Sequence, residues 1–112
     1  MTLDRRDLTA ASAPLAHARA MPAGFHTDPA IFAAERERIF LRDWFFLCRD
    51  DMLPGPGDCR TFDPPGGPVV ALRGADGQAR VFANCCRHRG SILLEGAGNC
   101  GGRVTCPYHG WS

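Results

Sequence analysis

The sequence contains no lysine. All thirteen of its basic residues are arginine, and with twelve acidic residues the formal net charge is only +1. A charge this close to zero gives no argument for a nucleic-acid partner or for an anionic membrane surface. No apolar run approaches the roughly 18 residues of a membrane span. We interpret the arginine excess as the coding bias of a GC-rich genome and not as an arginine-based binding site.

We also expect no export signal. Arg5 and Arg6 suggest a twin-arginine leader, but the segment after them carries Asp7, His17 and Arg19 and has no apolar stretch of the length required. The expected location is therefore cytoplasmic, where reducing conditions disfavour disulfides between the six cysteines. Cysteine together with histidine in such a protein points to a metal site.

At 112 residues the chain is long enough for one small domain. We expect residues 1–27 to form a loose arm with at most a short helical piece, and residues 28–43 to form a lead-in helix. Asp28 can cap that helix, and Pro29 fits its first position. Its apolar stripe is expected at Phe32, Arg36, Ile39 and Phe40, widened by Ile31.

Residues 44–112 are expected to form a mainly β, small antiparallel domain. Short runs rich in branched and aromatic residues alternate with glycine and proline, as is typical of strands and turns. The sequence GADG at 74–77 predicts a hairpin turn, because Asp76-Gly77 supplies the left-handed conformation that such turns need. The strands are expected at 43–50, 59–63, 68–73, 78–84 and 102–106.

Two short loops carry one cysteine and one histidine each. The first reads Cys86-x-His88 and the second reads Cys106-x-x-His109, with seventeen residues between them. If the loops face each other, the thiolates can converge on one side and the imidazoles on the other. That arrangement suits two iron ions bridged by sulfide, which is the Rieske 2Fe–2S centre. Because imidazole is a neutral donor, the histidine-held iron is the one that is reduced.

Two questions remain open at this point. A zinc site could also use two cysteines and two histidines, although both cysteines then usually share one knuckle. Cys85 to His88 is also a C-x-x-H pair. The alternation of side chains along the strand favours Cys86 over Cys85, and so does the pairing of C-x-H with C-x-x-H, which is the iron–sulfur pattern. The remaining cysteines are expected to pack as small buried groups, namely Cys48, Cys59 and Cys100.

Residues 84–91 (NCCRHRGS) and 106–111 (CPYHGW) resemble the two cluster loops of the Rieske non-haem iron ring-hydroxylating oxygenases. The likeness is to the N-terminal part of their large (alpha) subunit, and it extends more weakly through residues 28–49. It implies that the cluster ligands are Cys86, His88, Cys106 and His109. It also implies a possible electron-transfer interface at Arg89, His109 and Trp111.

The resemblance further implies a function. In that family the domain accepts electrons from a reductase or ferredoxin and passes them to a mononuclear non-haem Fe(II) in a separate catalytic domain. The transfer usually crosses a subunit boundary, which implies a homotrimer or an alpha–beta hetero-oligomer. The catalytic domain and the last Rieske strands are absent from this chain, so we expect an N-terminal fragment that is not catalytic alone.

The resemblance covers alpha subunits that act on quaternary amines as well as aromatic-ring mono- and dioxygenases. Two other functions stay open. One is a stand-alone Rieske ferredoxin, which would be an electron carrier and not an enzyme. The other is a zinc-stabilised interaction module.

Overall fold

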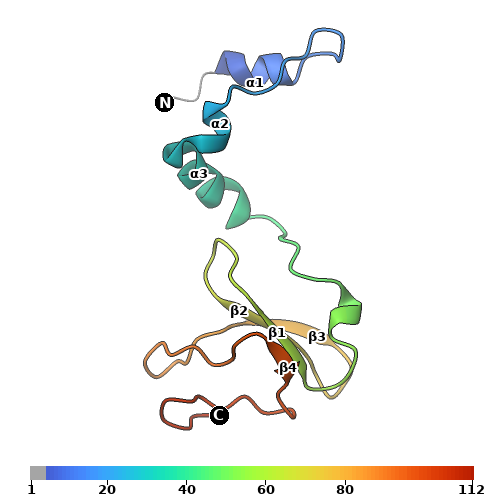
Figure 1. Ribbon diagram of the computed structural model, residues 1–112, viewed down its shortest axis with the longest axis vertical. Coiled ribbons are helices and arrows are strands. Elements are labelled where there is room, and N and C mark those ends of the chain that lie inside the picture. Colours follow the sequence, from blue (N-terminus) through green and yellow to red (C-terminus); the bar gives the residue numbers. More distant parts are fainter. Residues whose placement is uncertain (1–4) are drawn as a thin grey trace. The chain divides into compact units, whose positions relative to one another are not determined.

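The computed structural model describes residues 5–112, with side chains from Leu8 onward. The chain forms two compact units, residues 1–44 and residues 45–112. The N-terminal unit contains short helices and the C-terminal unit contains the β-sheet (Figure 1). Within the described residues, every helix is too short or too polar to cross a lipid bilayer.

The N-terminal unit contains α1 (Arg5–Ala11), α2 (Gly24–Thr27) and α3 (Pro29–Glu35), and α3 continues into the π-helical turn η1 (Arg36–Phe40). The expected arm at 1–27 thus holds two short helices. The predicted cap is confirmed, because the Asp28 carboxylate accepts a 2.8 Å hydrogen bond from the Ala30 N–H and Pro29 opens α3. Helical structure was expected to reach residue 43, but it ends at Phe40. The hydrogen bond from the Leu41 N–H to the Arg36 carbonyl closes this last turn.

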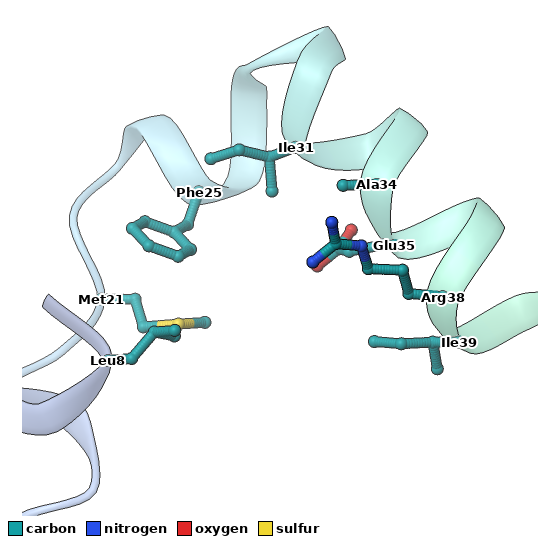
Figure 2. A pocket seen from close by; sticks show the side chains of 8 residues that line it. All are labelled: Leu8, Met21, Phe25, Ile31, Ala34, Glu35, Arg38 and Ile39. Carbon is teal, nitrogen blue, oxygen red and sulfur yellow. The ribbon is translucent and has the colours of Figure 1, made fainter. Parts of the chain in front are cut away.

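The predicted apolar stripe is correct at Ile31 and wrong at Phe32 and Ile39. Ile31 is 2% exposed, whereas Phe32 and Ile39 are 56% and 51% exposed. Side chains from α1, α2, α3 and η1 surround an apolar cleft (Figure 2), lined by Leu8, Met21, Phe25, Ile31, Ala34, Glu35, Arg38 and Ile39. Ile39 nevertheless lines the same apolar cleft as Ile31 (Figure 2), so its exposure reflects the open side of that cleft.

The C-terminal unit is built on a four-stranded antiparallel sheet in the order β3-β2-β1-β4. Its strands are β1 (Asp58–Phe62), β2 (Val69–Arg73), β3 (Ala79–Ala83) and β4 (Ala97–Asn99). The first three confirm the predicted strands at 59–63, 68–73 and 78–84. The predicted hairpin turn is confirmed as well, because the Gly74 N–H bonds to the Gln78 carbonyl and Gly77 has a φ of 77°.

Two predicted strands are absent from the described residues, and one strand was missed. Residues 44–49 have no regular secondary structure and no ladder partner, and a 3-10 turn, η2 (Asp50–Met52), follows them. Residues 102–106 also lack strand pairing. The missed strand, β4, reads Ala-Gly-Asn, a sequence with little intrinsic β preference. Its position comes from pairing with β1, to which the Asn99 amide adds a 2.8 Å hydrogen bond to Asp58.

The core of the C-terminal unit lies on both faces of β2. Val70 and Ala71 point to opposite faces and are 2% and 3% exposed. Leu53, also 2% exposed, reaches this core from the segment before β1. Arg73 at the end of β2 holds that segment, donating from Nε to the Leu53 carbonyl at 2.8 Å and from Nη2 to the Asp50 carboxylate at 2.7 Å.

We predict that Arg73→Met destabilises the C-terminal unit by about 1.5–3 kcal/mol, the usual range for a charged hydrogen bond. The methionine keeps most of the aliphatic stem but leaves the Leu53 carbonyl without its donor. Urea unfolding followed by tryptophan fluorescence and circular dichroism measures the change. Arg49→Met is the matched control, because its ion pair with Asp51 is open to solvent and should contribute little to stability. Equal losses of unfolding free energy in the two variants would contradict the role assigned to the Arg73 hydrogen bonds.

Candidate metal centre

Two loops in the C-terminal unit close with the same backbone hydrogen bonds. In loop 1, residues 84–91, the Cys86 N–H donates to the Ser91 carbonyl at 2.7 Å. In loop 2, residues 106–112, the Cys106 N–H donates to the Trp111 carbonyl at 2.6 Å. Each cysteine carbonyl also accepts from the glycine four residues later, at 2.8 Å from Gly90 and at 3.0 Å from Gly110. The two cysteines therefore hold equivalent positions.

This equivalence distinguishes Cys86 from its neighbour Cys85. Cys86 and Cys106 are both buried, with exposures of 7% and 3%. Cys85 is exposed and takes part in an isolated bridge with Ile92. Only Cys86 matches Cys106 in both burial and hydrogen bonding, so the geometry favours Cys86 as the candidate ligand of loop 1.

The four candidate ligands are grouped by type. The Cys86 thiol lies within hydrogen-bond reach of the Cys106 sulfur. The rings of His88 and His109 also adjoin each other, with centroids 4.9 Å apart and planes tilted by 57°. Sulfur donors from both loops thus lie together, and the imidazoles from both loops lie together.

The surroundings of Cys106 favour a thiolate. Its pKa is lowered chiefly by a hydrogen bond from the backbone N–H of Tyr108, while burial acts in the opposite direction. The backbone N–H of His109 lowers the pKa further. Thiolate is the form of cysteine that binds metal, so the backbone of loop 2 prepares this sulfur for that role.

These donors fit a two-iron cluster better than a single zinc ion. A mononuclear zinc site needs four ligands around one point. Among the side chains that the structure describes, from Leu8 to Ser112, no three His, Cys, Asp or Glu groups gather in the manner that one metal ion requires. A Rieske cluster needs only two side chains for each iron, and the structure presents one pair of thiols and one pair of imidazoles.

Asn84 fixes the base of loop 1. Its side chain is 2% exposed, and it both donates to the Leu94 carbonyl at 2.8 Å and accepts from the Leu94 N–H at 3.0 Å. These two bonds close the chain between residues 84 and 94 around Cys86 and His88. Sequence reasoning did not assign this function to Asn84; its only sequence signal was an asparagine where a strand enters the loop.

Aromatic side chains cover both imidazoles. The Trp111 indole of loop 2 stacks on His88 of loop 1, with centroids 4.7 Å apart and planes 6° from parallel. Tyr108 stacks on His109 at 3.8 Å, and the Arg89 guanidinium lies 5.9 Å from the Tyr108 ring centroid. Trp111 and Arg89, both expected near an electron-transfer interface, therefore each contact the opposite loop.

The other cysteines lie outside these two loops. Cys59 is buried as predicted, and burial raises the pKa of its thiol, with a further contribution from the nearby Cys100. Cys48 and Cys100 are only half-buried. All six cysteines are free thiols.

Comparison with known proteins identifies the domain. Residues 43–112 match the Rieske [2Fe-2S] domain family. The chain belongs to this family. The domain it contains is thus one that carries a Rieske-type 2Fe–2S cluster, and the match includes both loops and the whole sheet.

Curated relatives are large components of oxygenases. The chain is 46% identical over 87 residues to the large oxygenase component of a naphthalene 1,2-dioxygenase system from Pseudomonas aeruginosa, covering 77% of this chain and 19% of that protein. It is 38% identical over 92 residues to the carnitine monooxygenase oxygenase subunit of Escherichia coli K12, covering 82% and 25%. The chain therefore spans about a fifth to a quarter of the length of these relatives.

Solved structures of Rieske oxygenases also match this chain. The apo form of a quaternary ammonium Rieske monooxygenase matches with a TM-score of 0.77 and 38% identity, over 84% of this chain and 27% of that one. Naphthalene 1,2-dioxygenase from Rhodococcus sp. bound to indole matches with a TM-score of 0.77 and 30% identity, over 96% and 23%. The mainly β Rieske fold predicted from the sequence is thereby confirmed.

The loop geometry predicts opposite results for two adjacent cysteines. Cys86→Ser should abolish cluster incorporation, because it removes a buried thiol that meets Cys106. Cys85→Ser should leave iron and sulfide content unchanged, since this thiol is exposed. Iron and acid-labile sulfide are measured after reconstitution, and circular dichroism confirms that both variants are folded. Loss of the cluster in Cys85→Ser alone would contradict the assignment.

Stacking on His88 predicts a change in redox potential for Trp111→Leu. Removing the indole admits water beside His88, and more polar surroundings favour the more negatively charged reduced cluster. The midpoint potential in a dye-mediated titration should therefore rise, while Trp111→Phe, which keeps a stacked ring, should stay near the wild-type value. A phenylalanine variant that shifts as far as the leucine variant would show that stacking is not the cause.

Proposed function

We propose that this chain carries single electrons on a Rieske 2Fe–2S cluster, with Cys86 and Cys106 holding one iron and His88 and His109 holding the other. The observation that supports this most strongly is the matched closure of the two loops, which pairs thiol with thiol and imidazole with imidazole. When bound, the cluster supplies a one-electron couple in the range of about −150 to +300 mV.

The chain's own residues set the conditions for that couple. Buried cysteines keep water from the sulfur side of the site, and the N–H groups of Tyr108 and His109 point toward the Cys106 sulfur. Hydrogen bonds to sulfur raise the potential of such clusters, because they stabilise added negative charge. Both imidazoles are exposed, so their outer nitrogens can meet a partner.

We further propose that the domain works within a longer oxygenase. It would receive electrons from a reductase or ferredoxin and pass them, through His109, to a mononuclear non-haem Fe(II) in a catalytic domain of a neighbouring subunit. A homotrimeric or alpha–beta assembly in the cytoplasm would suit this role. Arg89 and Trp111 lie beside the proposed exit at His109 and His88.

For the substrate of the longer protein, we favour aromatic-ring hydroxylation. The identity to the naphthalene 1,2-dioxygenase component, 46%, exceeds the 38% to the carnitine monooxygenase subunit. Oxidation of a quaternary amine is the second candidate. It is supported by the apo quaternary ammonium monooxygenase structure, which is 38% identical to this chain, whereas the Rhodococcus naphthalene 1,2-dioxygenase is 30% identical at the same TM-score of 0.77.

Similarity in the N-terminal unit favours an oxygenase over a stand-alone Rieske ferredoxin. The Rieske family match begins at residue 43, yet the matches to the oxygenase components extend over 87–92 residues. The match to the Rhodococcus structure covers 96% of the chain. A carrier ferredoxin would need only the C-terminal unit, whereas these relatives share much of the helical lead-in as well.

Reconstitution with iron and sulfide tests the proposed cluster. We expect equal amounts of iron and sulfide in the chain, and an EPR spectrum after dithionite reduction with an average g value below that of the free electron. Replacing His88 with cysteine should move the average g toward that of an all-cysteine cluster, because one neutral donor becomes a thiolate. A chain that binds zinc and remains EPR-silent after iron reconstitution would contradict the proposal and favour the zinc-stabilised module.

A further inference from the structure

Two free thiols outside the cluster loops lie next to each other where β1 pairs with β4. Cys59 in β1 is opposite Gly98 in β4. The pairing continues past the end of β4, because the Cys100 N–H donates to the Gly57 carbonyl at 2.8 Å. Residues two apart in a strand share a face, so Cys59 and Cys100 are diagonal neighbours on one face of the sheet. The two thiols interact, since Cys100 contributes to raising the pKa of Cys59.

No side chain stands between these two thiols. The residue directly opposite Cys59 is Gly98, and the residue opposite Cys100 is Gly57. A Cβ placed on Gly98 would meet no heavy atom within 4 Å, so the space over this glycine is open. Cys59 is only 8% exposed, whereas Cys100 is half-buried. Cys100 is therefore the thiol that a small reagent reaches first, and Cys59 is the thiol behind it.

The position of β4 allows the two cysteines to be joined. A disulfide needs Cβ atoms about 3.8 Å apart, and diagonal neighbours start farther apart, so one strand has to shift. β4 is an outer strand of the sheet and consists of three exposed residues. Beyond it the Arg103 N–H bonds to the Cys100 carbonyl at 3.2 Å, in the turn that leads to loop 2. A bond at Cys100 would therefore fasten the chain where it turns toward Cys106.

We propose that Cys59 and Cys100 form a site of reversible oxidation, at which a low-molecular-weight disulfide such as glutathione disulfide joins them to each other. The Cys100 sulfur attacks glutathione disulfide and releases one glutathione, and the Cys59 sulfur then attacks Cys100 and releases the second. In each step the proton of the protein thiol passes to the departing glutathione thiolate. Two protein thiols thus lose two electrons, and one glutathione disulfide becomes two glutathiones.

This inference goes beyond the proposed electron transfer and does not depend on a bound cluster. In a reducing compartment such a bond is transient and forms when small disulfides accumulate. It would hold β4 against β1 under those conditions, and reduction by glutathione would release it.

Peptide mapping tests whether the bond forms. Trypsin cleaves after arginine and gives peptides 50–60 and 90–103, which contain one cysteine each, while the ligand cysteines lie in 81–87 and 104–112. The full chain is incubated with glutathione disulfide, the remaining thiols are blocked with iodoacetamide, and unreduced peptides are identified by mass spectrometry. We expect 50–60 linked to 90–103. A main internal link through Cys85, the exposed cysteine, would show that exposure alone governs oxidation and would overturn the proposal.

Dilution of the glutathione buffer distinguishes an internal disulfide from a mixed one. At a constant ratio of glutathione disulfide to glutathione, a tenfold dilution should raise the oxidised-to-reduced ratio of this pair about 10-fold, because two glutathiones are released for each disulfide consumed. A mixed disulfide at Cys100 would not respond. An unchanged ratio would therefore overturn the proposal.

Hydrogen exchange and matched variants test what the bond does. Oxidation should slow exchange of the Cys100 amide about 10-fold or more, because this N–H reaches solvent when β4 leaves β1. The Gly74 amide, bonded within the β2–β3 hairpin, is the internal control and should not change. Cys100→Ser should lose both the link and the slowing, whereas Cys48→Ser, which removes another half-buried thiol, should keep both. Equal slowing at Gly74 and Cys100 would contradict a bond that acts on β4.

Discussion

The site depends on one backbone interaction made twice, the hydrogen bond from a cysteine N–H to the carbonyl five residues later. This bond turns each loop back on itself, and the returning chain passes through Gly90 or Gly110 at φ values of 70° and 75°. A residue with a Cβ is strained in that conformation. Both loops obey the same constraint, and their cysteines are both buried and lie together, as do their histidines.

The sheet holds these loops by polar bonds as much as by apolar packing. Asn84 clamps loop 1 through both atoms of its amide, and Arg73 ties the segment before β1 to the end of β2. Few large side chains are fully buried, and Leu53 is the largest of them among the described residues. In a domain of this size the apolar core is small, so satisfied polar groups at loop bases contribute a large share of the rigidity that a metal site needs.

Sequence reasoning found the parts of this structure that are encoded locally. The strands β1 to β3 carry their own branched and aromatic residues, the hairpin carries Asp76-Gly77, and the spacing of cysteine and histidine drew attention to both loops. The missed features depend on distant partners. β4 is a strand because β1 pairs with it, and residues 43–49 resemble a strand but find no neighbour. The clamp at Asn84 requires knowing that Leu94 returns to it.

The shared loop geometry nevertheless leaves the two imidazoles in different surroundings. The histidine is the third residue of the motif in loop 1 and the fourth in loop 2, counted from the equivalent cysteines, so the two rings leave the backbone at different points. His88 lies against a neutral indole, whereas His109 lies against a phenol ring that also contacts a guanidinium. A nearby positive charge stabilises electron density on the adjacent ligand. Two loops with one backbone design thereby give an electron carrier with two distinct faces.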